Sequence, residues 1–586
     1  MNNIKKITGI IFVMLLIAGC EDVLDKENLQ AITKEDVFGN YNIAEAYLND
    51  IHADLMPNYV NSWYGSGEAT HTDEAVGTYG RPLTSPYILG NITFESYNHF
   101  PYDVIRRINL FLEDIDAATF DDVQKKQLKG EVLFWRAWAY FSMVKLYGGV
   151  PLVIEAAPVG ERDDIFVPRN KTSECFTQII KDMDDAINLL KDKDADGRID
   201  KCAAMAFKGR VLLFKASPQF NRSNNVSLWE DAYNANKQAI TFLNSQGKGL
   251  YDSYRGIWLD KMNKEVIMVR RYKYPDVTNS KFATRLRPEN YTSGGGGLNI
   301  PSLELVNADP LKDGSMWDPN TMDYRNLNQN RSQRFYDQIA YNGASPYLPD
   351  MVTNSENLWT YYYDKDGDPD TGRNGKEANP VSISQNVSFS SFYCAKFNDQ
   401  NITKETLDNS AVDYIEFRYA EVLLNFAEAA NEDGNINEAL DALYQIRNRA
   451  GIDAGVDGKY GITATTVDEL RLVIQNERFV ELAFEDKRWM DLRRWRIYTK
   501  VFSDIGTRHG LFIEYNGPVS ERPTGLANID TFYDRLTITV QEDNAGMPAM
   551  LEEDKYSFFG IPQNVLDRNS KFEQNNTWGG TFDPLQ

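Results

Sequence analysis

Flat aromatic side chains beside charged and amide groups are the part of this sequence best suited to binding chemistry. A sugar ring presents C–H groups on one face and hydroxyls around its rim, so a site for it combines aromatic platforms with planar hydrogen-bonding groups. Two stretches offer this combination outside any helical pattern. The candidate ligand-binding residues are Trp63, Tyr64, Tyr79 and Arg81 in the first stretch, and Trp317, Arg325, Trp359 and Tyr361 in the second. The alternative is that these rings only pack loops onto a scaffold.

Two acidic runs have the alternating oxygens that calcium prefers. The first run begins at Asp192, and its twelfth position is Ala203, where an EF-hand needs a bidentate Glu. We interpret this run as a solvated turn before a helix. The second run also lacks a closing acid and stays open between a turn and a Ca²⁺ site. Its candidate ligands are Asp364, Asp366 and Asp368.

Catalytic motifs are missing from the sequence. Its 4 histidines show no HExxH spacing, no GxSxG motif occurs, and the glycine run 294–297 lacks the Lys-Ser/Thr of a phosphate loop. A glycosidase needs only two opposed carboxylates, and spacing alone cannot find such a pair among 85 acidic residues. We interpret the clustered Glu477, Arg478, Glu481, Arg488 and Asp491 as structural ion pairs between packed helices. The sequence therefore predicts a protein that is not an enzyme.

Helical periodicity predicts the elements that must position these residues. Apolar residues recur at helical spacing through residues 36–243, with helices expected at 127–147, 203–217 and 229–243. Periodicity fails over 245–408, where only short strand-like runs such as 265–269 occur. Helices are expected again at 412–430, 436–449 and 467–495, and residues 503–586 read mostly as loop. Amphipathic helices that follow one another in this way indicate stacked helix-turn-helix units.

The first residues have the layout of a secretory signal. Lys5 and Lys6 precede an apolar run that is too short to span a bilayer, which needs about 20 residues. Residues 17–20 resemble a bacterial lipobox, which implies a signal peptide over 1–19 and a lipid on Cys20. The acidic residues after Cys20 resemble the surface-export signal of Bacteroidetes lipoproteins. The alternative is an ordinary cleaved signal with a chance cysteine.

Charge and cysteine content narrow the possible partners. The 586-residue chain carries a formal charge of −23, which repels nucleic acid and anionic lipid, so we expect no nucleic-acid partner. Cys175, Cys202 and Cys394 show no metal or redox spacing. We expect buried free thiols, although a disulfide between Cys175 and Cys202 stays open.

Several motifs in order resemble the SusD/RagB family. They are RAWAYFSMVKLYGGVPLV at 136–153, FRYAEVLL at 417–424, QIRNRAG at 445–451 and FGIP at 559–562. The resemblance implies a scaffold of four tetratricopeptide-like helix pairs. It also implies a surface lipoprotein that captures nutrients, usually glycans, for a SusC-like TonB-dependent transporter of the outer membrane.

The combined prediction is a mainly α protein, with tetratricopeptide-like helix pairs forming a scaffold and a large loop-rich region that carries a few short strands. The expected parts are a signal peptide (1–19), an N-terminal helical region (20–245) and a second region (246–586) that is loop-rich over 246–410, helical over 411–500 and a packed tail over 501–586. We expect it to bind a glycan and to be lipid-anchored on the outer membrane, facing the exterior. Alternatives are a peptide-binding uptake lipoprotein of the same fold and a surface glycoside hydrolase.

Overall fold

The structure is a computed structural model in which paired helices carry a loop-rich half. It describes residues 33–59, 68–76, 87–88, 90–156, 166–280, 282–287, 297, 299–344, 357–363, 377–378, 388–399, 401–402, 406–518, 532–542 and 551–586. Helix accounts for 48% and strand for 10% of the described residues, which confirms the prediction of a mainly helical fold with a few short strands.

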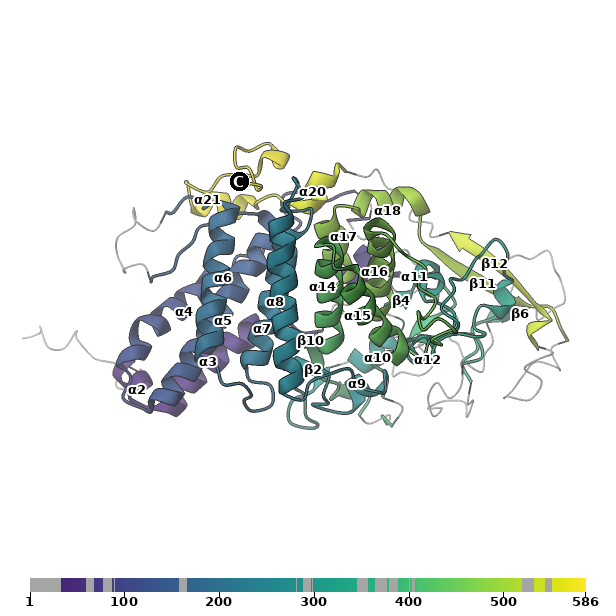
Figure 1. Cartoon of the computed structure of the whole chain (residues 1–586), viewed down its shortest axis with the longest axis horizontal. Coiled ribbons are helices and arrows are strands. Elements are labelled where there is room, and N and C mark those ends of the chain that lie inside the picture. Colours follow the sequence, from purple (N-terminus) through teal and green to yellow (C-terminus); the bar gives the residue numbers. More distant parts are fainter. Residues whose placement is uncertain are drawn as a thin grey trace, which may run out of the picture.

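The first half is built from helices that pair with their neighbours in sequence. They are α2 (Lys34–Gly39), α3 (Tyr41–Leu55), α4 (Tyr102–Asp114), α5 (Asp122–Tyr147), α6 (Thr172–Leu189), α7 (Lys201–Ala216) and α8 (Val226–Ser245). Helix α5 packs on α6, and α7 packs on α8, and Figure 1 shows these four side by side. The predicted helices 127–147, 203–217 and 229–243 correspond to α5, α7 and α8.

Helix α5 shows how the sequence sets its own ends. It begins where the Asp121 carboxylate accepts a hydrogen bond from the backbone N–H of Val123 at 2.8 Å. It ends at Gly148, whose φ of 78° favours glycine. Gly149 is needed for a different reason, because a Cβ there would lie 2.0 Å from the carbonyl oxygen of Asn170.

A second helical group follows the loop-rich region. Its members are α14 (Tyr419–Glu432), α15 (Ile436–Arg449), α16 (Val467–Glu481), α17 (Arg488–Trp495) and α18 (Tyr498–Ile505). The prediction of 436–449 is confirmed by α15, and Gly434 forms the turn before it with a φ of 85°. Helix α14 packs on both α8 and α15, so the two helical groups are continuous.

The expected helices at 412–430 and 467–495 need correction. The start of the first is strand β10 (Tyr414–Arg418), which pairs antiparallel with β2 (Val266–Arg270). The second breaks between α16 and α17, where Phe484 and Asp486 have φ values of 64° and 58°. No glycine or proline marks this break. It is held by segment 68–76, whose Glu74 carboxylate accepts a hydrogen bond from the backbone N–H of Phe484 at 2.7 Å.

The tail is more ordered than its sequence suggested. Strands β11 (His509–Tyr515) and β12 (Leu536–Glu542) pair antiparallel over seven residue pairs. Leu511, Ile513 and Tyr515 alternate with less buried residues, which is the period of a half-buried strand. This alternation was the signal that the prediction of a loop missed.

The remaining elements of the described residues are short. The strands are β1 (Ala75–Val76) with β4 (Ile300–Pro301), β3 (Asn279–Ser280) with β9 (Asn409–Ser410), β5 (Ile339–Ala340) with β8 (Tyr393–Cys394), and β6 (Tyr362–Tyr363), which joins β11 and β7 (Glu377–Ala378). The helices are α9 (Gly256–Leu259), α10 (Phe282–Leu286), α11 (Leu303–Ala308), α12 (Gln333–Gln338), α20 (Glu553–Ser557) and α21 (Gln563–Arg568), with 3₁₀ turns η1 (Glu68–His71), η2 (Ile115–Ala117), η4 (Tyr324–Asn326) and η6 (Asn576–Trp578).

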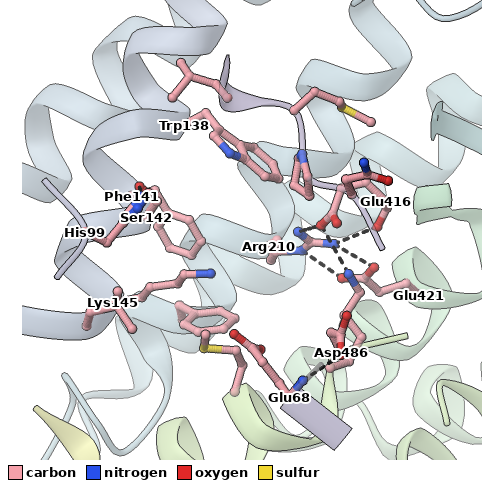
Figure 2. A pocket seen from close by; sticks show the side chains of 18 of the residues that line it. Glu68, His99, Trp138, Phe141, Ser142, Lys145, Arg210, Glu416, Glu421 and Asp486 are labelled. Carbon is pink, nitrogen blue, oxygen red and sulfur yellow. Dashed lines mark hydrogen bonds and ion pairs between the residues drawn. The ribbon is translucent and has the colours of Figure 1, made fainter. Parts of the chain in front are cut away.

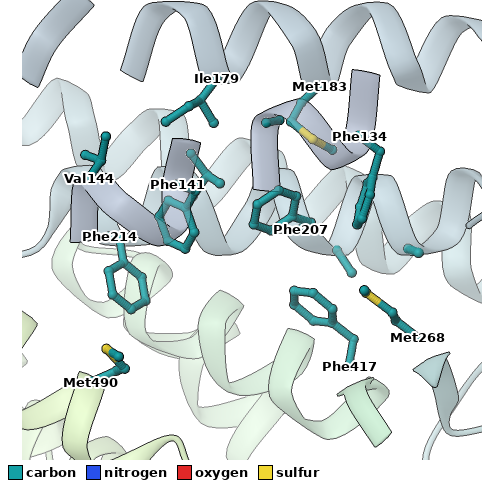
Figure 3. Close-up of a cluster of buried hydrophobic side chains, with 14 of the residues drawn as sticks. Phe134, Phe141, Val144, Ile179, Met183, Phe207, Phe214, Met268, Phe417 and Met490 are labelled. Atoms are coloured by element: carbon teal, nitrogen blue, oxygen red, sulfur yellow. The ribbon is translucent and has the colours of Figure 1, made fainter. Parts of the chain in front are cut away.

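Two large apolar cores hold these elements together. The first joins α3–α8, β2, β10 and α14–α18, and Figure 3 shows its aromatic centre. There Phe141 of α5 meets Phe207 and Phe214 of α7 edge-on, at ring-centroid distances of 5.5 and 5.2 Å. The second core lies in the loop-rich half. The first core draws on both predicted regions, 20–245 and 246–586, so the two share one interior.

Buried ion pairs link the second helical group to the loop-rich half. Arg418 bonds Glu265, Glu481 and Glu485, at 2.6 to 2.8 Å. Arg478 binds Asp491 at 2.8 Å. The interpretation of the clustered arginines and acids as structural ion pairs is confirmed.

The three cysteines of the described residues are buried and free. Burial raises the pKa of Cys175 to about 11, so its thiol is protonated and unreactive at neutral pH. The prediction of free thiols is confirmed. In the part of the chain that the structure describes, every helix is too short or too polar to cross a bilayer.

Candidate functional site

Three of the predicted ligand-binding rings belong to the scaffold. Trp359 and Tyr361 have no exposed surface and pack on Phe532, each at a ring-centroid distance of 5.0 Å. Trp317 is 7% exposed and is covered by the Arg331 guanidinium at 5.3 Å. The prediction that these rings stack on a ligand is wrong, because neither face of a buried ring can meet a sugar.

The other predicted site residues divide into one exposed residue and a group that the structure does not place. Arg325 is exposed and donates to the carboxylate of Asp323, two residues earlier. Trp63, Tyr64, Tyr79, Arg81, Asp364, Asp366, Asp368 and Cys20 lie outside the described residues. Their roles stay predictions. Among the described residues, no group of three or more His, Cys, Asp or Glu side chains could hold a metal ion.

The first acidic run is used within the fold. Asp200 caps α7 by accepting a hydrogen bond from the backbone N–H of Ala203 at 3.0 Å. Asp192 pairs with Lys201 at 2.8 Å, and Asp196 pairs with Arg271 at 3.2 Å. These contacts support the interpretation of a polar turn before a helix.

A cavity of about 370 Å³ lies between the two helical groups (Figure 2). It is lined from one side by α5 and α7, and from the other by β10, α14 and the break between α16 and α17. Asn58 and Glu68 also line it, and they flank the segment that carries Trp63 and Tyr64. A concave site of this size with a few converging polar groups is the default position for ligand binding.

One face of α5 supplies the wall of the cavity. Trp138, Phe141, Ser142 and Lys145 follow one another at intervals of three, one and three residues, so they lie on one side of the helix. The first two are aromatic and the last two are polar. Figure 2 shows the Lys145 ammonium directed into the cavity from this face.

The opposite wall contains charges that are already paired. Arg210 of α7 donates two hydrogen bonds to the Glu421 carboxylate, at 2.8 and 2.7 Å, and one to the Glu416 carboxylate at 2.5 Å. Lys487 binds the same Glu416 at 3.1 Å. This cluster is electrically satisfied and gives the cavity a rigid polar wall.

Three other charged groups at the cavity lack such partners. Within the described residues, the Lys145 ammonium has no hydrogen-bond or ion-pair partner, and Glu68 accepts only a 3.5 Å contact from Tyr97. Asp486 accepts a 2.9 Å hydrogen bond from the backbone N–H of Glu68, but no cation of the described residues lies within ion-pair distance of it. Figure 2 shows Lys145 and Glu68 reaching into the cavity from opposite sides.

Burial favours the uncharged form of all three groups and moves the pKa of each closer to 7. Desolvation lowers the pKa of Lys145 to about 8, and the nearby Glu68 opposes this shift. Desolvation raises the pKa of Glu68 to about 7 and that of Asp486 to about 6. Titratable groups perturbed in this way inside a cavity are typical of functional sites.

His99 adds a neutral group at the rim. Its Nε2 lies 2.8 Å from the Ser142 hydroxyl, and burial lowers its pKa to about 4. The imidazole is therefore uncharged at neutral pH and can donate or accept a hydrogen bond. Together these groups can bind a polar molecule that has hydrogen-bonding groups around an apolar face.

The cavity residues were missed because they come from distant parts of the sequence. The one local signal was Lys145, a cation on a helix face whose other cavity residues, Trp138, Phe141 and Ser142, are uncharged. Such a residue must reach water, a counter-ion or a cavity, because an isolated buried charge is costly.

Comparison with family models covers nearly the whole chain. The model described as "SusD family" matches residues 191–578, and the one described as "Starch-binding associating with outer membrane" matches residues 28–213. Among curated proteins, "SusD-like protein P38" of Formosa agariphila is 26% identical over 531 residues, covering 86% of this chain and 94% of that protein. "SusD-like protein P2" of the same organism is 24% identical over 530 residues, with 86% and 92% covered.

Solved structures show the same fold. A SusD-like protein of Bacteroides fragilis has a TM-score of 0.71 at 23% identity, with 94% of this chain and 99% of that chain covered. A SusD-like carbohydrate-binding protein of the same species has a TM-score of 0.69 at 21% identity, with 92% and 100% covered.

Proposed function

Because this chain belongs to the SusD family, we propose that it captures a nutrient oligosaccharide at the cell surface and delivers it intact to a TonB-dependent transporter of the outer membrane. Its broader class is established. It is a non-catalytic, SusD-like carbohydrate-binding protein associated with the outer membrane. The capture step, the transporter partner and the lipid anchor on Cys20 are the parts that we propose.

The observation that carries this proposal is the match of family models to residues 28–213 and 191–578. A starch-binding description over the N-terminal helices agrees with a ligand site built on those helices. The signal-like layout of residues 1–19 before Cys20 supports attachment by lipid. Several acyl chains on one cysteine hold a protein stably on a membrane, since each buried methylene adds about 0.8 kcal/mol.

We assign glycan binding to the cavity between α5 and the break before α17. Trp138 offers a partly exposed ring at its wall, while Lys145 and Glu68 offer a donor and an acceptor that have no strong partner among the described residues. A sugar whose hydroxyls bridge these two groups would satisfy both charges. Binding of one or two sugar rings in this way corresponds to a binding free energy of roughly 4 to 7 kcal/mol, or a Kd near millimolar to tens of micromolar.

The test is affinity electrophoresis of the purified protein through gels that contain soluble polysaccharides. We expect at least one glycan to retard the protein, and Lys145→Met and Glu68→Gln to reduce that retardation. Lys129→Met is the matched control, because Lys129 lies on the same helix and pairs with Asp116 at the surface. Equal retardation of all variants would show that the glycan binds outside this cavity.

The same experiment separates the alternatives. Release of reducing sugar from a retarding glycan would contradict the non-catalytic assignment. Peptides remain the second candidate ligand, because Lys145, Glu68 and Asp486 could receive the two charged ends of a peptide. Binding of a peptide mixture by a protein that no glycan retards would establish that candidate.

A further inference from the structure

A second cavity lies at the C-terminal end of α17, whose N-terminal turn lines the first. Its volume is about 460 Å³, and it is bounded by the start of α8, the end of α14, α16 and the end of α17. Met490 and Asp491 of α17 line the first cavity, whereas Trp495 and Arg496 line the second. The two cavities are therefore separate, although one short helix contributes to both.

Two arginines at this cavity share a single carboxylate. Arg496 donates to Asp554 Oδ1 at 2.5 Å, and Arg222 donates to the same oxygen at 3.1 Å. The Asp554 side chain is 45% exposed, and the arginine side chains are 31% (Arg222) and 20% (Arg496) exposed. One negative charge is thus divided between two guanidinium groups that solvent can reach.

The other charged residues of the cavity wall have partners of their own. Arg471 binds Glu432 through two hydrogen bonds, at 2.6 and 2.7 Å, and Asp468 through one at 2.6 Å. Glu428 is held by two hydrogen bonds from Arg494, at 2.5 and 2.6 Å. Arg222 and Arg496, in contrast, have one carboxylate between them, that of Asp554.

The backbone and the walls fix this arrangement. Arg496 ends α17 in the left-handed region, with a φ of 59°, and its main chain is held by bonds to the carbonyls of Leu492 and Arg493. The wall includes two indoles whose N–H groups are already used, that of Trp229 by Asn224 and that of Trp495 by Glu428. Among the described residues, Arg222 Nη1 and Arg496 Nη2 have no hydrogen-bond acceptor, so both guanidiniums keep donors for a ligand.

We propose that this second cavity is a binding site for an oxyanion, namely the carboxylate or sulfate group of an acidic saccharide. A planar guanidinium presents paired N–H donors that match the oxygens of either group, and two guanidiniums can hold one anion between them. Such an anion would give the two guanidiniums a second negative partner beside Asp554. Burial and the neighbouring Arg496 lower the pKa of Arg222, which agrees with two cations lying too close for a single acid.

The test uses sodium glucuronate and sodium sulfate as probes, titrated into the full-length protein at constant ionic strength with sodium chloride. Binding is followed by tryptophan fluorescence and by the thermal midpoint, with glucose as the neutral control. We expect a saturable response to at least one anion and none to glucose. A response to glucuronate identifies carboxylated sugars as ligands, and a response to sulfate alone identifies sulfated ones.

Variants decide whether the arginine pair is the site. Arg222→Gln should weaken anion binding by about tenfold, the effect of losing one charge-assisted hydrogen-bond pair. Arg496→Gln should act in the same direction, while Lys181→Gln removes an equal charge from an exposed pair elsewhere, with Asp185, and should change nothing. No saturable response to either anion, or an unchanged response in Arg222→Gln, would overturn the proposal. Neither result bears on the glycan test, which depends on Lys145 and Glu68.

Discussion

Replacement of Lys145 by methionine should stabilise the fold and weaken ligand binding at the same time. Methionine keeps most of the length of the side chain and removes the ammonium. In the protein that ammonium is buried beside a cavity without an ion-pair partner among the described residues. A charge kept in such a place reduces stability. Residues that serve binding commonly lower the stability of the fold, and Lys145 fits this pattern.

The magnitude follows from the pKa of this lysine. Desolvation lowers it from 10.5 to about 8. At roughly 1.4 kcal/mol for each pH unit, the charged form loses at most about 3 kcal/mol in the folded protein. The ammonium borders the cavity and keeps part of its hydration, so we expect Lys145→Met to raise the free energy of unfolding by about 1 to 3 kcal/mol.

The sign of the pH dependence is fixed by the same pKa values. The pKa of Lys145 is lower in the folded protein than in the unfolded chain. The charge of Lys145 therefore destabilises the folded protein fully below about pH 8, and this destabilisation disappears as the pH rises toward 10.5. The charged groups that act on Lys145 are Glu68, Glu416, Arg210 and Lys487. The stability advantage of Lys145→Met should therefore be largest at neutral pH and should shrink to about a quarter of that value at pH 10.

Calorimetry of the wild type, Lys145→Met and the Lys129→Met control tests this prediction. For 586 residues the unfolding entropy is about 1.2 kcal/mol/K. A gain of 1 to 3 kcal/mol then raises Tm by roughly 1 to 2 °C if the chain unfolds as one unit. A lower Tm in Lys145→Met, or a difference from wild type that does not change with pH, would refute the reasoning.

Three further changes test the scaffold and the anchor. Arg418→Met should lower stability by about 3 to 5 kcal/mol in chemical denaturation, because it leaves Glu265, Glu481 and Glu485 buried with fewer cations; a loss below 1 kcal/mol would contradict the buried network. Trp359→Ala should cost about 3 to 5 kcal/mol in the same assay and leave glycan retardation unchanged, since this ring has no exposed surface; lost binding in a stable variant would return Trp359 to the site. Cys20→Ala should release the protein from membranes in cell fractionation, and labelled palmitate that still enters this variant would reject the anchor.

The sequence predicted the elements whose pattern is local. Helices α5 and α15 carry continuous apolar faces, and the glycines that end or precede them have positive φ values. The break between α16 and α17 could not be predicted in this way. Its left-handed residues are held by Glu74 and by the backbone of Glu68, which lie about 400 positions earlier in the chain. A contact so distant leaves no periodic signal.

The candidate site was predicted less well, for a related reason. An aromatic residue in a loop can bind a ligand or fill a core, and composition does not distinguish the two. Trp359 and Tyr361 fill the second core, where Phe532 packs on both. The cavity instead depends on Lys145, and on Glu68 and Asp486, which the break in the helix brings toward it.

The pairing of charges elsewhere makes the unmatched ones informative. Arg418 shows that this fold can give a fully buried cation three carboxylates. Against that background, a lysine that has no partner among the described residues and an arginine pair that shares one carboxylate are departures. Both occur at cavities that α17 helps to line. If the unmatched charges serve ligands, then neutral sugars should compete at the first cavity only, and acidic groups should bind at the second without displacing them.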